Sequence, residues 1–135
     1  MIYNHNCLGL LVDDVPAAVD FYTNVMGYGV HELNHDGVTF TEFVTGGPAV
    51  LFVWRWSHLE EHLGKEAMSR VKHRVQSAIY FDTVEELEHA YLQLKAAGID
   101  FITELKDWVW NARGAYFVDD EGYMWELYSG IPHPA

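Results

Sequence analysis

The sequence repeats one pattern of secondary structure, and this repeat limits the possible folds more than any other feature. In the first copy, the apolar run CLGLLV (residues 7–12) is typical of a short buried strand. Asp14 then suits the N-cap of a helix over residues 15–26, because its carboxylate can accept from free amides of the first turn. Turn residues divide the rest of this copy into three predicted strands, at 28–34, 38–45 and 49–56.

The second copy follows the same order. QSAIYF (residues 76–81) predicts a strand, and Thr83 with Glu86 forms a capping box before a helix that Gly98 ends. Three further strands are predicted at about 100–105, 113–118 and 123–129. The repeat predicts a single α+β domain over residues 1–135, with βαβββ modules at about 1–56 and 75–135. Residues 57–74 between them are polar and irregular, and we interpret them as a linker with room for a helical turn or more.

Composition narrows the class of protein. Half of the 135 residues are hydrophobic, but no apolar run approaches the roughly 20 residues that cross a bilayer. The N-terminus lacks the basic start and small-residue cleavage site of a signal peptide. A formal net charge of −12 argues against nucleic acid and membrane partners, and the one cysteine cannot form an internal disulfide. We therefore expect a soluble, cytoplasmic protein.

Two segments carry a resemblance to a known family. The opening LLVDDVPAAVDFYTNVMGY, the closing FVDDEGYMWELY and the βαβββ repeat resemble the vicinal-oxygen-chelate superfamily. That superfamily includes glyoxalases, bleomycin-resistance proteins, fosfomycin-modifying enzymes and extradiol dioxygenases. The resemblance implies two modules whose strands form a curved mixed sheet around a cavity, with helices outside, and a homodimer. The closing turn, residues 119–122, reads Asp-Asp-Glu-Gly where such proteins usually have Asp-Pro-Asp-Gly.

The resemblance also implies four positions for metal ligands. Enzymes of the superfamily hold a divalent metal on the first and fourth strands of the two modules, and alignment of the copies places these positions at Cys7, Phe52, Gln76 and Glu126. Only Glu126 is a usual ligand, Phe52 cannot ligate, and a thiolate beside an amide oxygen is a poorly matched pair. We expect no metal cofactor. The alternative is one ion of Zn, Ni, Mn or Fe held by Glu126 and Gln76 with His5 or Cys7.

Aromatic side chains point to a different kind of site. Strand alternation puts Phe52, Trp54 and Trp56 on one face, Met124, Glu126 and Tyr128 on another, and Gln76, Ala78 and Tyr80 on a third. Trp108 and Trp110 fall in a segment that would form the rim. The resemblance makes these faces the walls of the cavity. The predicted ligand-binding residues are Cys7, Phe52, Trp54, Gln76, Tyr80, Trp108, Trp110, Glu126 and Tyr128.

Histidines offer little support for a metal. His35, His58 and His62 fall in predicted loops, where a solvated imidazole is the ordinary case. His58 and His62 are four residues apart and would pair only if the linker is helical.

Three functions remain open from the sequence. We favour metal-independent binding of a small aromatic or cationic organic molecule, which resembles the bleomycin-resistance branch. The alternative is a metal-dependent, glyoxalase-like lyase or isomerase, or a dioxygenase, with Glu126 as a metal ligand. A structural or regulatory module that binds a partner is the third. No catalytic residue is assigned.

Overall fold

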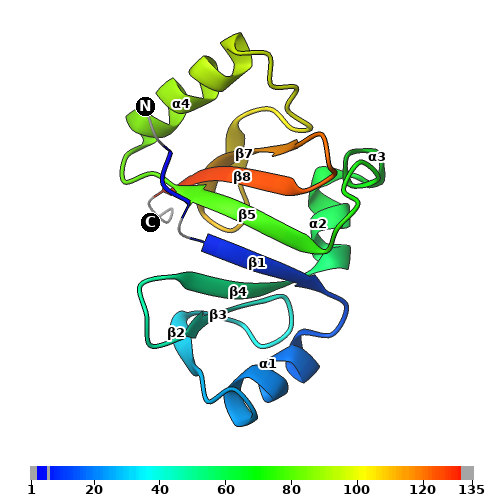
Figure 1. Cartoon of the computed structure of the whole chain (residues 1–135), viewed down its shortest axis with the longest axis vertical. Helices are drawn as coiled ribbons and strands as arrows, with labels where there is room; N and C mark the ends of the chain where they lie inside the picture. Colours follow the sequence, from blue (N-terminus) through cyan, green and yellow to red (C-terminus); the bar gives the residue numbers. More distant parts are fainter. Residues whose placement is uncertain (1–2, 6, 132–135) are drawn as a thin grey trace.

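A computed structural model describes residues 3–5 and 7–131, and its strands form one eight-stranded mixed sheet with helices on the outside (Figure 1). The extreme ends of the two predicted modules, residues 1–2 and 132–135, lie outside the described residues. The elements in chain order are β1 (Cys7–Val12), α1 (Val15–Asn24), β2 (Gly29–His35), β3 (Phe40–Val44), β4 (Val50–Arg55), α2 (Trp56–Leu63), α3 (Lys65–Met68), β5 (Val75–Tyr80), α4 (Val84–Ala96), β6 (Lys106–Trp108), β7 (Ala112–Val118) and β8 (Met124–Gly130).

The sheet confirms the predicted α+β fold and its βαβββ repeat. Its strand order is β2-β3-β4-β1-β5-β8-β7-β6, so the two modules lie side by side and meet where β1 pairs antiparallel with β5. Within the modules, β1 pairs parallel with β4 and β5 pairs parallel with β8. Gly9 pairs with Phe52, and Ala78 pairs with Glu126 at the matching place in the second module. The register therefore makes Phe52 and Glu126 equivalent.

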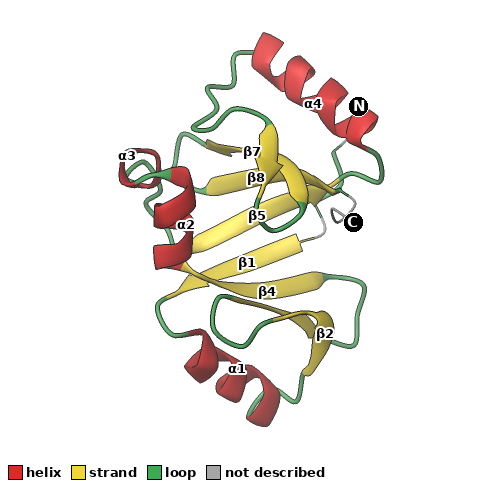
Figure 2. Ribbon diagram, turned by 180° about the vertical axis from the view of Figure 1, so that it is seen from behind, coloured by secondary structure: helices red, strands yellow, loops and turns green. Residues whose placement is uncertain are grey.

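Each long helix begins at its predicted cap and covers the outer face of its own module. Asp14 Oδ1 accepts a hydrogen bond of 3.0 Å from the N–H of Ala17, and Thr83 Oγ1 accepts one of 3.1 Å from the N–H of Glu86. Both bonds satisfy amides that have no partner within the helix. Helix α1 lies beside the first module and α4 beside the second (Figures 1 and 2). Both helices leave the inner face of the sheet uncovered.

The connection between the modules is more helical than the sequence indicates. Trp56, which we placed at the end of a strand, begins α2, and α3 follows directly after Gly64. Residues 57–74 are mostly polar, but Leu59, Met68 and Val71 are buried in the central core. These helices close one end of the sheet (Figure 2).

One predicted strand is wrong. Residues 100–105 form only an isolated bridge between Phe101 and Phe117, and the strand beside β7 is β6 instead. The N–H groups of Ile102 and Thr103 both reach the carbonyl oxygen of Tyr116, at 2.9 and 3.4 Å, so no regular ladder forms there. Phe101 packs against Tyr91 of α4 and Phe117 of β7, whereas Ile102 packs against the inner core, and neither residue extends the sheet.

Apolar packing divides into outer and inner parts. In the outer part of the first module, Val15 of α1 clusters with Phe43 and Val53 of the sheet. In the second module, Leu87 of α4 clusters with Leu127. The inner core contains Cys7, Phe52, Trp54, Ala78, Tyr116 and Met124. No helix among the described residues is long and apolar enough to cross a membrane.

Phe52 depends on a glycine opposite it. Its ring lies directly against the α-carbon of Gly9, where a Cβ would overlap the ring carbons. We predict that Gly9→Ala lowers the free energy of unfolding by about 1–3 kcal/mol, because the added methyl must displace a packed ring. Urea denaturation measures the change. Gly47→Ala is the matched control, since nothing lies within 4 Å of its added methyl, and equal stability losses in the two variants would contradict the packing described.

Candidate functional site

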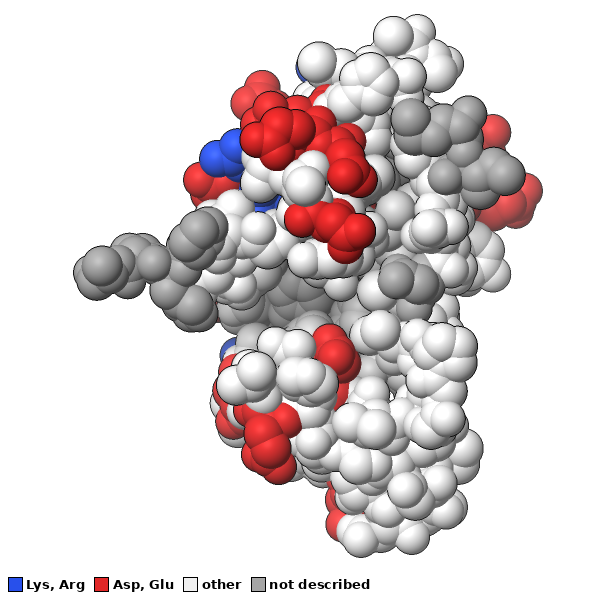
Figure 3. All heavy atoms as spheres, turned by 90° about the vertical axis from the view of Figure 1, so that its left-hand side faces the viewer, with Lys and Arg blue, Asp and Glu red and all other residues white. Residues whose placement is uncertain are grey.

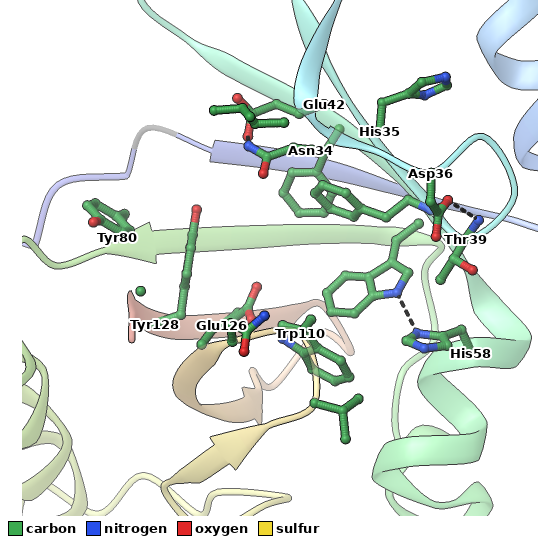
Figure 4. Close-up of a pocket in the computed structure, with 18 residues that line it drawn as sticks. Asn34, His35, Asp36, Thr39, Glu42, His58, Tyr80, Trp110, Glu126 and Tyr128 are labelled. Atoms are coloured by element: carbon green, nitrogen blue, oxygen red, sulfur yellow. Dashed lines mark hydrogen bonds between the residues drawn. The ribbon is translucent and has the colours of Figure 1, made fainter. Parts of the chain in front are cut away.

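A cavity of about 630 Å³ opens on the inner face of the sheet and is lined by both modules (Figure 4). Its lining residues are Leu33, Asn34, His35, Asp36, Thr39, Phe40, Glu42, Phe52, Trp54, His58, Tyr80, Val109, Trp110, Asn111, Ala112, Glu126, Tyr128 and Gly130. Six of the nine predicted ligand-binding residues are among them: Phe52, Trp54, Tyr80, Trp110, Glu126 and Tyr128. The other three, Cys7, Gln76 and Trp108, are buried and do not line the cavity.

Aromatic rings form much of the wall. The indoles of Trp54 and Trp110 meet edge to face, with ring centroids 4.9 Å apart and planes at 90°. Trp108 stacks on Trp110 at 5.1 Å and donates its Nε1–H to the carbonyl oxygen of Gly114. Trp108 thus supports the rim from behind, whereas Trp110 reaches the cavity. Phe52 also lines the cavity, and its ring meets that of Trp54 edge to face.

The carboxyl group of Glu126 is held at the floor of the cavity. Its Oε1 accepts a hydrogen bond of 2.6 Å from Nε2 of Gln76, and its Oε2 accepts one of 2.7 Å from the hydroxyl of Tyr116. The residue is 4% exposed. Burial raises the pKa of Glu126 to about 7, although the hydrogen bonds from Tyr116 and Gln76 oppose that rise. The carboxyl group therefore changes charge near neutral pH.

A thiol and a phenol lie beside this carboxyl group. Sγ of Cys7 is 3.5 Å from the hydroxyl oxygen of Tyr128. Burial raises the pKa of the Cys7 thiol and the pKa of the Tyr128 hydroxyl. Both groups stay protonated at neutral pH, so Cys7 offers a neutral thiol rather than a thiolate nucleophile.

The predicted loop position of His35, His58 and His62 is wrong, because His35 ends β2 and both His58 and His62 lie on α2. His58 accepts, at its Nδ1, a hydrogen bond of 3.0 Å from Nε1 of Trp54. Its ring centroid is 4.4 Å from that of His62 one turn later. His58 and His35 both line the cavity. The four-residue spacing of His58 and His62 was the sequence signal for this pair, but it has meaning only on a helix.

Two acidic residues of the cavity carried no recognised signal in the sequence. Asp36 lies in the turn between β2 and β3, and Glu42 lies on β3. Burial raises the pKa of Asp36, but backbone N–H groups of Thr39, Val38 and Phe40 outweigh it and hold that pKa below its ordinary value. With Glu126, the lining contains three carboxyl groups, and the described lining residues include no Lys or Arg.

The donor set does not suit a divalent metal. At the four implied positions, Phe52 has no donor atom, Cys7 and Gln76 are buried and do not line the cavity, and both oxygens of Glu126 accept protein hydrogen bonds. His5 lies against the indole of Trp125, with ring centroids 5.5 Å apart. Trp125 alternates with Glu126 on β8 and so faces away from it. The part of the chain that the structure describes contains no cluster of three His, Cys, Asp or Glu side chains that would hold a metal.

One polar atom near Glu126 has no partner among the described residues. Oε1 of Gln76 is buried and accepts no hydrogen bond, while Nε2 of the same amide donates to Glu126. The amide is therefore oriented by the carboxyl group rather than by its own acceptor.

The raised pKa of Glu126 predicts a pH dependence of stability. The folded state holds the Glu126 proton up to about pH 7, whereas the unfolded chain releases it near pH 4.5. Stability from this group is fully present below pH 4.5 and is lost as pH rises toward 7. We predict that wild type loses roughly 3 kcal/mol across this range relative to Glu126→Gln. Urea unfolding of both proteins at several pH values measures this; parallel pH curves would contradict a buried carboxyl group.

Comparisons with known proteins agree with the fold and the repeat. The model of the Glyoxalase/Bleomycin resistance protein/Dioxygenase superfamily matches residues 4–127. A solved structure titled NAD-dependent benzaldehyde dehydrogenase, from Legionella pneumophila, is 15% identical with a TM-score of 0.75, covering 92% of this chain and 97% of its own. A hypothetical protein from Bacillus halodurans is 17% identical with a TM-score of 0.66, covering 100% and 99%.

A third structure is a superfamily member from Vibrio splendidus, 17% identical with a TM-score of 0.52, covering 91% of this chain and 96% of its own. No curated protein matches the sequence significantly. At these identities the solved structures show the fold alone. The family match spans nearly the whole chain, and the chain belongs to the glyoxalase/bleomycin resistance protein/dioxygenase superfamily.

Proposed function

We propose that this protein binds a small aromatic cation in the cavity without the help of a metal. The observation that carries the proposal is the composition of the lining: indole, phenyl and phenol rings with three carboxyl groups, and no Lys or Arg among the described lining residues. Apolar, aromatic cavities with a few fixed polar groups suit organic ligands. A cation gains from both the ring faces and the carboxylates.

The rings are well suited to a planar ligand. Trp54 is held by His58 through its indole N–H, and Trp110 is held between Trp54 and Trp108. Rings that are fixed before binding lose little conformational entropy when a ligand stacks on them. A planar group that lies against these rings in the cavity would replace contacts with water by contacts with the rings.

Electrostatics favour positive charge in the ligand. The chain carries a formal net charge of −12, and acidic side chains gather in both the upper and the lower part of the face drawn in Figure 3. Asp36 remains ionised because backbone amides stabilise its carboxylate. A cation brought near Glu126 would also favour ionisation of that carboxyl group.

A second candidate function is acid–base catalysis by Glu126. Its pKa of about 7 keeps the acid and the base populated at neutral pH, and it faces the cavity. The metal-dependent lyase or oxygenase remains a weaker alternative, since only Glu126 offers a usual ligand at the four implied positions.

The charge preference can be tested with matched ligands. We predict that a biphenyl with one aminomethyl group binds at least about tenfold more tightly than the same biphenyl with one hydroxymethyl or carboxylate group. Quenching of tryptophan fluorescence, with chelator present, measures the affinities. Equal affinities for the three compounds, or preference for the carboxylate, would contradict the proposal. Loss of binding in chelator alone would point to a metal.

The role of stacking predicts a ranking of variants. Trp54→Ala should weaken binding of the aminomethyl biphenyl by about 10–100-fold, more than Glu126→Gln does, because it removes a whole wall. Trp56→Ala is the matched control, since Trp56 does not line the cavity. Isothermal titration calorimetry gives the affinities. The reverse ranking would indicate that ionic contact with Glu126 dominates recognition.

A further inference from the structure

We propose that the cavity recognises an aromatic ligand with a cationic group at each end, one bound by Glu126 of the second module and the other by Glu42 of the first. This inference rests on the proposed binding of an aromatic cation and adds the number and placement of the charges.

The repeat places Glu42 and Glu126 on different modules, Glu42 on β3 of the first and Glu126 on β8 of the second. Glu42 pairs with Phe52 across β3 and β4, as Tyr116 pairs with Glu126 across β7 and β8. Because Phe52 and Glu126 are equivalent in the repeat, Glu42 occupies the first-module counterpart of the Tyr116 position. The acid and the aromatic ring are therefore interchanged between the modules. In the first module the acid lies on the third strand and the ring on the fourth, and in the second module the ring lies on the third strand and the acid on the fourth. Figure 4 shows Glu42 and Glu126 on different sides of the space they line.

Glu42 is an available carboxylate. It is half-buried, and its Oε1 accepts one hydrogen bond of 3.2 Å from Nδ2 of Asn34. Among the described residues, the ion pairs involve Asp13, Glu88, Asp100 and Asp107, and none reaches Glu42. The Glu42 side chain is therefore available to an ammonium group of a ligand.

The charges of Glu42 and Glu126 both affect the pKa values of Cys7 and Tyr128. Burial is the main reason why the pKa values of Cys7 and Tyr128 are raised, and the charges of Glu126 and Glu42 both add to the rise at each of these groups. The Cys7–Tyr128 pair, neutral and 3.5 Å apart, thus lies within the electrostatic reach of both carboxyl groups. Both carboxyl groups therefore act on the same Cys7–Tyr128 pair.

The separation of the two carboxyl groups calls for two charges rather than one ion. Strands β4, β1 and β5 lie between β3 and β8, so at about 4.8 Å per strand the path along the sheet is roughly 19 Å. The curvature of the sheet shortens the gap across the cavity, and we infer that two separate charges span this gap better than one small ion does. Trp54 and Trp110 line the space that an aromatic spacer between two ammonium groups would cross.

The test compares two probes on wild type and three variants. The probes are a biphenyl with one aminomethyl group and a biphenyl with one aminomethyl group at each end. Wild type should bind the dication at least about tenfold more tightly than the monocation, because a second charged hydrogen bond forms. Glu42→Gln and Glu126→Gln should each reduce this ratio to within about twofold.

Glu32→Gln is the matched control for long-range electrostatics. Glu32 lies on β2 of the same hairpin as Glu42, is exposed and does not line the cavity, so this variant should keep the wild-type ratio. If Glu126→Gln fails to fold, the comparison of Glu42→Gln with Glu32→Gln still decides the matter. A wild-type ratio near one, or a ratio unchanged in Glu42→Gln, would overturn the two-anchor site while leaving the aromatic-cation proposal standing. Failure of the monocation to bind would instead contradict the proposed function itself.

Discussion

The antiparallel pairing of β1 with β5 is the constraint on which the rest of the structure depends. In each βαβββ module the parallel pair lies at one edge of the four strands, so β1 or β5 would be an exposed edge strand if it had no further partner. Pairing these two edges joins the modules into one curved sheet, so the helices cover only the outer face. The inner face is left to line a cavity, and the register of the seam sets which side chains reach it.

Divergence of the two modules at equivalent positions explains the chemistry of this cavity. Phe52 packs on Gly9 in the first module, whereas its counterpart Glu126 is held by Gln76 and Tyr116 in the second. A symmetric set of donors would converge on a metal, but here one half contributes rings and the other a buried acid. The polar groups at the floor hydrogen-bond mainly to each other. Glu126 is thus oriented by the protein before anything enters the cavity.

Local signals in the sequence predicted the frame of the fold. Asp14 and Thr83 bond to amides three residues away, so their caps could be predicted from local sequence. Strand alternation grouped Trp54 with Phe52 and Glu126 with Tyr128, and the resemblance to the superfamily implied that these faces line the cavity. The sequence did not predict helix α2, because Leu59 is the buried residue of this helix and most of the residues around it are polar. The cavity role of His58 depends on that helix. Glu42 was overlooked because its role appears only when β3 is paired with β4 beside Phe52.

The central claim is that the cavity serves an organic cation and not a metal ion. Elemental analysis of protein purified without affinity tags or chelators tests it most directly, with Glu126→Ala purified in parallel. The account predicts no divalent metal near one equivalent in either protein, and no gain in thermal stability on adding Zn, Ni, Mn, Co or Fe(II). Near-stoichiometric metal in wild type that is lost in Glu126→Ala would contradict the account and make Glu126 a metal ligand.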